Sequence, residues 1–143
     1  MQQIPNARRW LDRCGAGNNG GDGYVVARLA GDQGIAVKVV SLVDPAKLRG
    51  DAATAFADFH SEGGVAASWD GALDDESDLI VDAILGSGLE RDVDGEFASA
   101  VAAINRHAAS VVALDIPTGI HGDSGNVLGT AVSADLTITF VGL

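Results

Sequence analysis

Short apolar runs alternate along the chain with longer segments whose apolar residues recur every three or four positions. Runs of about 4 to 8 residues rich in Val, Ile and Leu are typical of buried strands, whereas the wider spacing is typical of amphipathic helices. The apolar runs predict strands at 9–14, 35–43, 65–69, 79–85, 111–116 and 136–141. The amphipathic segments predict helices at 23–32, 47–60 and 95–107.

The alternation of strands and helices predicts βαβ units and therefore a sheet of mostly parallel strands. We expect an α/β fold, a Rossmann-like three-layer αβα sandwich, with the whole chain of 143 residues forming a single domain. Parallel sheets bind ligands beyond the carboxyl ends of their strands. The loops at 14–23, 86–92 and 115–125 each follow an expected strand, so we expect them to meet at one edge.

Charge narrows the classes of ligand. The chain carries 20 acidic and 9 basic residues, which gives a formal net charge of −11. Such a surface repels polyanions, so we expect no binding of nucleic acid. An anionic small molecule has to be held by local groups such as backbone N–H groups, a helix N-terminus or a bound cation.

Cysteine and hydropathy patterns indicate a soluble protein of a reducing compartment. Cys14 is the single cysteine, so no disulfide can form within the chain, and we expect a packed free thiol at the end of a strand. No apolar run approaches the roughly 18 residues that span a bilayer, and the N-terminus lacks the apolar core of a signal peptide. We therefore expect a cytoplasmic location and no membrane.

The segment 14–23 is the most unusual part of the sequence, because it places five glycines within the nine residues 15–23. Glycines allow a ligand to approach the backbone closely, and successive N–H groups can form a nest that binds an anion. A helix expected to begin near Asp22 would add the positive end of its dipole. The segment therefore predicts a phosphate-holding loop that leads into a helix.

Two interpretations of this loop are open on spacing alone. Gly15, Gly17 and Gly20 satisfy the GxGxxG pattern, and Asp44 follows the next strand, where a ribose-binding acid belongs in dinucleotide-binding folds. This spacing indicates an NAD-dependent oxidoreductase. However, such enzymes do not usually carry an Asn-Asn pair and Gly-Asp-Gly at residues 18–23.

Three ordered motifs resemble a known family. Residues 18–23 read NNGGDG, residues 81–89 read VDAILGSGL, residues 113–120 read ALDIPTGI, and the strand that follows at 134–140 reads ADLTITF. Together they resemble the YjeF N-terminal domain family, the NAD(P)H-hydrate epimerases, over nearly the whole chain. Relative to that family the chain is expected to be shortened at both ends.

The resemblance implies a ligand and a reaction. Members of the family bind NADHX or NADPHX, nicotinamide cofactors hydrated at C6, and interconvert the R and S epimers. The residues that would bind this ligand lie in two loops and at the end of the fifth strand. They are Asn18, Asn19, Gly20, Gly21, Asp22, Gly86, Ser87, Gly88, Leu89, Glu90, Arg91, Asp92 and Asp115.

The resemblance also implies a potassium ion held by Asn19, Asp82 and Thr118. Amide, carboxylate and hydroxyl oxygens are hard donors that suit a hard cation and are poor ligands for zinc or copper. Thr118 stands where the family often has Ser, and it keeps the hydroxyl. The implied partners are a homodimer mate and an NAD(P)HX dehydratase, either fused or separate.

Epimerisation at a carbon that bears a hydroxyl can proceed by loss and re-addition of water through an iminium-like cation. This path needs a general acid and base, and developing positive charge favours nearby carboxylates. Our hypothesis assigns the work to Asp115, with Asp22 as the second choice. His107 and His121 are weaker candidates.

Three functions therefore remain open from the sequence. The first is an NAD(P)H-hydrate epimerase, and the second is an NAD-dependent oxidoreductase. The third is a non-catalytic binding or scaffold module built on the same domain. An intact NNGGDG motif favours a working ligand site over a scaffold.

Overall fold

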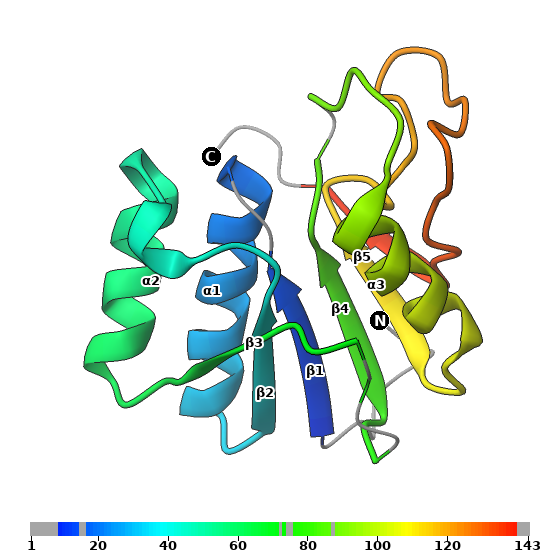
Figure 1. The fold of residues 1–143 in the computed structure, drawn as a ribbon. Helices are drawn as coiled ribbons and strands as arrows, with labels where there is room; N and C mark the ends of the chain where they lie inside the picture. Colours follow the sequence, from blue (N-terminus) through cyan, green and yellow to red (C-terminus); the bar gives the residue numbers. More distant parts are fainter. Residues whose placement is uncertain (1–8, 15–16, 72, 74–75, 87, 140–143) are drawn as a thin grey trace.

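The structure is a computed structural model that describes residues 9–14, 17–71, 73, 76–86 and 88–139. Six parallel strands form one sheet in the order β3-β2-β1-β4-β5-β6 (Figure 1). The strands are β1 (Arg9–Cys14), β2 (Ala36–Ser41), β3 (Ala66–Ser68), β4 (Leu79–Ala83), β5 (Ser110–Leu114) and β6 (Leu136–Ile138). This order is that of the doubly wound α/β folds, and its direction reverses between β1 and β4.

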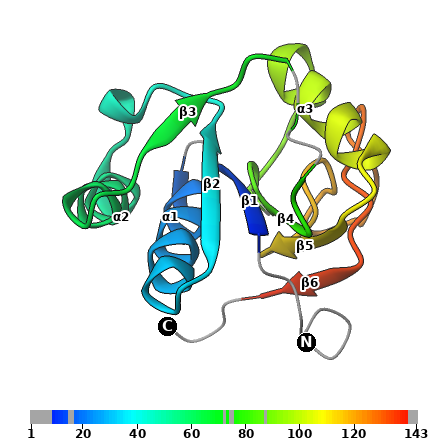
Figure 2. The ribbon, with the colours of Figure 1, turned by 90° about the horizontal axis from the view of Figure 1, so that it is seen from below.

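Helices cover both faces of the sheet, which completes the three predicted layers. Helices α1 and α2 lie side by side on one face, and α3 lies on the other (Figure 2). The helical segments are α1 (Gly17–Asp32), the short 3-10 turn η1 (Pro45–Lys47), α2 (Gly50–Ser61) and α3 (Gly95–Arg106). None of the helices in the described part of the chain is long and apolar enough to cross a membrane.

Neighbouring residues of β2 show how the sheet divides the core. Val39 packs with Tyr24 of α1 and Phe59 of α2, whereas Val40 belongs to the cluster that contains Ile104 of α3. Successive side chains of a strand point to opposite faces, so β2 contributes to both clusters. The predicted α/β sandwich is confirmed.

Strand β4 is the centre of this architecture. All five of its residues are buried, as expected for a strand of a parallel sheet covered on both faces. Four of them are apolar and the fifth is Asp82, which is 0% exposed. An acid in that position needs partners from neighbouring loops, and those partners define the candidate site.

The start of α1 corrects the prediction for the glycine-rich segment. The helix begins at Gly17, not near Asp22 or Gly23, so most of the expected loop is the first part of a helix. Glycine disfavours helix on its own, but packing explains Gly21. A Cβ at Gly21 would lie 2.9 Å from the Cα of Ala52, so the absence of a side chain allows α1 and α2 to pack closely.

Other element boundaries differ from the predictions by a few residues. The expected helix at 47–60 is divided into η1 and α2. The expected strand at 111–116 ends at Leu114, because Asp115 adopts a φ of +72°, which no strand residue has. The expected strands at 79–85 and 136–141 end at Ala83 and Ile138, and residues 140–141 lie outside the described residues.

Gly21→Ala is expected to destabilise the protein although alanine is the better helix former. Placing a methyl group against the Ala52 backbone costs about 1–3 kcal/mol, against a gain of about 1 kcal/mol in helix propensity. Gly31→Ala in the same helix is the matched control, because nothing lies within 4 Å of a Cβ there. Urea unfolding should show lower stability for Gly21→Ala and higher stability for Gly31→Ala; higher stability for both would refute the packing argument.

Candidate functional site

The candidate site lies at the carboxyl edge of the sheet, where β1, β4 and β5 end. Asp82 is held there by three hydrogen bonds: Oδ2 accepts from Thr118 N at 2.8 Å, and Oδ1 accepts from Thr118 Oγ1 at 2.6 Å and from Ile84 N at 3.2 Å. A buried carboxylate is costly unless it is paired or well hydrogen-bonded. Its partners therefore fix the loop after β5 against the end of β4.

Thr118 joins two of the three predicted loops. Its side chain is fully buried, and its Oγ1 accepts a hydrogen bond from Leu85 N at 3.1 Å while it donates to Asp82. The next residue, Gly119, has a φ of +96°, and a Cβ there would lie 2.0 Å from the carbonyl oxygen of Thr130. Only glycine fits that position, so the turn after Thr118 is held by close backbone packing.

Asp115 sits at the end of β5 in an uncommon backbone conformation. It is the one residue other than glycine with positive φ among the described residues, and Asp tolerates this region better than most residues. Its N–H donates to Ile138 O at 2.7 Å, and its carbonyl accepts from Thr139 Oγ1 at 3.1 Å. Backbone strain of this kind is often found at functional sites.

Gly86 brings Asp115 and Asn19 close together. A Cβ on Gly86 would lie 2.9 Å from Asp115 Oδ2 and 3.3 Å from Asn19 Cβ. The first turn of α1 therefore meets the loops after β4 and β5 around a position that has no side chain. The predicted convergence of the three loops at one edge is confirmed.

Asn19 is buried with 5% exposure, but neither its Oδ1 nor its Nδ2 has a hydrogen-bond partner among the described residues. Most buried polar atoms in folded proteins are satisfied by protein, water or an ion. An unpaired amide in this position therefore fits a group that comes from outside the chain.

Asp22 lies one turn farther along α1, near Asp115. Burial raises the pKa of the Asp22 carboxyl above its ordinary value of 3.8, and the nearby negative charge of Asp115 raises the pKa further. Two carboxylates that repel each other in a partly buried site favour retention of a proton. The carboxyl of Asp22 therefore keeps its proton to a higher pH than an ordinary aspartic acid does.

Several of the remaining predicted residues lie away from the contact between Asn19, Gly86 and Asp115, or are exposed. Gly21 has its Cβ position against α2, Leu89 packs partly against the α3 core, and Gly88 is exposed. Arg91 and Asp92 are exposed too. Ser87 and the side chain of Asn18 lie outside the described residues.

One interaction was not predicted from the sequence. Nε2 of His121 lies 3.3 Å from Oε2 of Glu90, and His121 Nδ1 accepts from Ser124 N at 3.1 Å. This contact joins the loops 86–92 and 115–125 on the solvent side. The two residues are 31 positions apart, and neither has a spacing signal that would pair them.

The sheet order and the site together define a class of protein. This is a doubly wound α/β domain with its polar residues gathered where the strand order reverses, the usual ligand-binding position of such folds. The chain belongs to the family described as YjeF-related protein N-terminus, whose model matches residues 1–143. The resemblance found in the motifs is confirmed.

Curated relatives carry two kinds of name. The chain is 42% identical over 139 residues to the Bifunctional NAD(P)H-hydrate repair enzyme Nnr of Escherichia coli K12, covering 97% of this chain and 27% of that protein. It is 39% identical over 142 residues to the NAD(P)H-hydrate epimerase of Limosilactobacillus fermentum, covering 98% of this chain and 67% of that protein. The chain thus spans about a quarter of the bifunctional relative and about two thirds of the epimerase.

A solved structure supports the fold independently. The crystal structure of the yeast protein ynu0 superposes with a TM-score of 0.79, covering 95% of this chain and 62% of that chain, at 22% sequence identity. At that identity the likeness shows the fold alone.

Thr118→Val is expected to lower the free energy of unfolding by about 2–3 kcal/mol, because it removes the hydroxyl that donates to a buried carboxylate. Thr118→Ser keeps the hydroxyl and should cost only about 1 kcal/mol for the lost methyl group. Chemical unfolding of both variants checks this difference. Equal losses would mean that the hydroxyl does not hold the loop to Asp82.

Asp22→Asn is expected to raise the melting temperature at pH 7. The pKa of Asp22 is raised in the folded protein, so the protonated form of this carboxyl favours folding. The contribution to stability is complete below the unfolded pKa of about 3.8 and is lost as the pH rises through the folded pKa. The advantage of the Asn variant should therefore disappear near pH 3.

Melting curves between pH 3 and pH 8 test the sign of this effect. Asp58→Asn, on the exposed side of α2, controls for removing one negative charge from an acidic chain. A gain for Asp22→Asn no larger than that of the control, or one that persists at low pH, would contradict the prediction.

Proposed function

We propose that this chain carries the epimerisation of NADHX and NADPHX, the R and S forms of hydrated nicotinamide cofactors. The observation that carries the proposal is the position of Asp115, whose carboxylate faces the first turn of α1 across Gly86. Burial raises the pKa of Asp22, and the negative charge of Asp115 adds to this effect. Relatives about 40% identical over nearly all of the chain bear the name NAD(P)H-hydrate epimerase.

The proposed ligand site consists of the same residues that the motifs indicate. The start of α1, with Asn18 to Asp22, would supply backbone N–H groups and helix dipole to an anionic part of the ligand. The loop from Gly86 to Asp92 would cover the ligand from the side of β4. Asp115 would lie against the hydrated ring.

A potassium ion is proposed at Asn19, Asp82 and Thr118. The unpaired amide of Asn19 supports this choice, and the oxygen donors of the three side chains suit a hard cation. The ion would supply positive charge that offsets the carboxylates around the ligand. The contacts of Asp82 with Thr118 would orient both residues toward it.

Asp115 is proposed as the group that moves the proton. A carboxylic acid would protonate the C6 hydroxyl, so that the C–O bond breaks and water leaves behind a cation delocalised over the ring. Water then adds to either face of C6, and its proton returns to a carboxylate, so atoms and charge balance over the cycle. The raised pKa of Asp22 would help keep one proton within the pair.

The proposed function also implies partners and a compartment. Names of bifunctional relatives support a dehydratase that is fused to such a domain or acts beside it. We propose a homodimer and the cytoplasm as the working state and compartment, since a single cysteine is compatible with a reducing environment.

The test is exchange between the R and S epimers of NADPHX, followed by chromatography in potassium and in choline buffers. The wild-type protein should exchange the epimers faster with potassium. Asp115→Asn should lower the rate about 10²- to 10⁴-fold, which is the usual contribution of a general acid or base. Asn tolerates positive φ, so the loop should keep its conformation.

Asp123→Asn, an exposed acid of the same loop, is the matched control and should retain the rate. No exchange by folded wild-type protein would favour a binding or scaffold module. Hydride transfer to an acceptor would favour an oxidoreductase. An undiminished rate in Asp115→Asn would remove Asp115 from the mechanism.

A further inference from the structure

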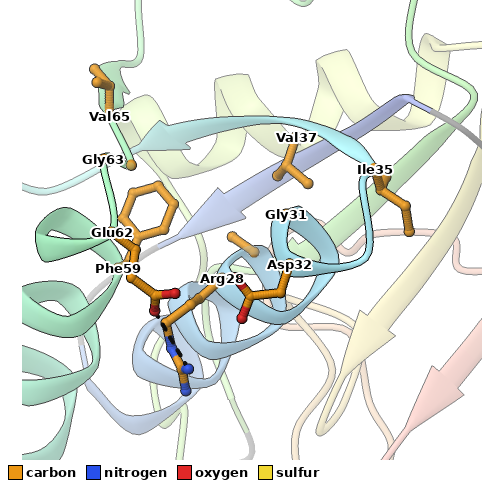
Figure 3. Close-up of a pocket in the computed structure, with 11 residues that line it drawn as sticks. Arg28, Gly31, Asp32, Ile35, Val37, Phe59, Glu62, Gly63 and Val65 are labelled. Carbon is orange, nitrogen blue, oxygen red and sulfur yellow. Dashed lines mark ion pairs between the residues drawn. The ribbon is translucent and has the colours of Figure 1, made fainter.

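A cavity lies at the opposite end of the sheet from the candidate site. Its volume is about 460 Å³, within the range of small-molecule pockets. It is formed by the last turns of α1, the start of β2, the end of α2 and the turn that follows α2 (Figure 3). Because α1 begins at the candidate site and ends here, the cavity is separate from the predicted ligand loops.

The cavity has an apolar wall and space left by glycines. Phe59, Val37 and Ile35 supply apolar surface. Gly31 and Gly63 border the space, and a Cβ at either position would meet no atom within 4 Å. The cavity can therefore hold a hydrophobic group of moderate size without any movement of the backbone.

Three charged residues line the other side. Arg28 and Asp32 are one turn apart on α1, so they face the same way, and Glu62 follows α2 (Figure 3). One cation and two anions at one side of an apolar space match a ligand that carries both charges.

Arg28 is incompletely satisfied. Its Nη1 lies 3.6 Å from Glu62 Oε2, an ion pair too long for a good hydrogen bond, and its side chain is 28% exposed. Its Nε is buried and has no hydrogen-bond partner among the residues the structure describes. A guanidinium has five N–H donors in a planar fork that fits a carboxylate, so the exposed part of this group can bind a carboxylate from outside.

We propose that this cavity binds a free α-amino acid with an apolar side chain. Its carboxylate would bind the Arg28 fork, its ammonium group would lie against Asp32 and Glu62, and its side chain would fill the space beside Phe59 and Val37. A free amino acid is favoured over a peptide, because only the free molecule carries both charges on one Cα. The proposal is independent of the epimerase reaction.

The test titrates L-phenylalanine into ¹⁵N-labelled protein and follows the amide signals of Gly31, Gly63 and Gly64. We expect saturable shifts at these amides with a dissociation constant of order 1 mM. N-acetyl-L-phenylalanine lacks the ammonium charge and L-phenylalaninamide lacks the carboxylate. Each should bind about tenfold more weakly, because each loses a hydrogen-bonded charge.

Variants test separately how the cation, the anions and the apolar space contribute to binding. Arg28→Gln should weaken L-phenylalanine about tenfold and leave L-phenylalaninamide unchanged, since the amide does not use the fork. Asp32→Asn should weaken L-phenylalanine and spare the N-acetyl compound. Gly31→Leu fills the open space and should abolish binding of all three, while Leu29→Gln, an exposed position on the same helix, should change nothing.

Three results would overturn the proposal: no saturable shift with wild-type protein up to about 50 mM L-phenylalanine, binding of either analogue as tightly as L-phenylalanine, or binding that survives Gly31→Leu. Melting curves confirm that each variant is folded. A failed epimerase assay leaves these outcomes unaffected, because the ligand and the end of the sheet are different.

Discussion

The buried carboxylate of Asp82 is the constraint on which the functional edge of this domain depends. It lies in the central strand with no exposure to solvent, where an unsatisfied charge would be strongly unfavourable. Thr118 supplies two hydrogen bonds to the carboxylate, and the hydroxyl of Thr118 also accepts one from Leu85 N. The polypeptide after β5 must therefore return over the end of β4.

Asp115 lies at the start of this returning segment, at the end of β5. Its left-handed backbone conformation ends β5 and turns the chain toward Thr118, and hydrogen bonds to Ile138 and Thr139 hold it in place. Because Gly86 has no side chain, the carboxylate of Asp115 can approach the first turn of α1. The buried interaction thus joins the ends of β4 and β5, and Gly86 allows the start of α1 to lie against them.

The fold, and the sheet edge that holds the site, can be predicted from sequence patterns, because the burial of each segment determines its pattern of apolar residues. A mostly apolar run such as 79–83 indicates a strand covered on both faces, and alternating strands and helices indicate a parallel sheet with one ligand-binding edge. Motif resemblance indicated Asp82, Thr118 and Asp115, and the structure brings these segments together. Their roles in binding and catalysis stay predictions.

What the sequence did not predict depends on contacts between distant residues. The helix α1 begins early, at Gly17, and Gly21 within it packs so closely on Ala52 that a side chain would not fit. The contact of His121 with Glu90 joins two loops without any shared pattern. The cavity beside Arg28 arises only when the ends of α1 and α2 pack against the start of β2.

We propose that the carboxyl edge around Asp115 receives the hydrated nicotinamide ring. A crystal structure of the protein with NADPHX, grown in potassium, would show where the ring binds. We expect the ligand across the ends of β1, β4 and β5, with the C6 hydroxyl within hydrogen-bond distance of Asp115. A ligand bound elsewhere, or a ring turned away from Asp115, would contradict it.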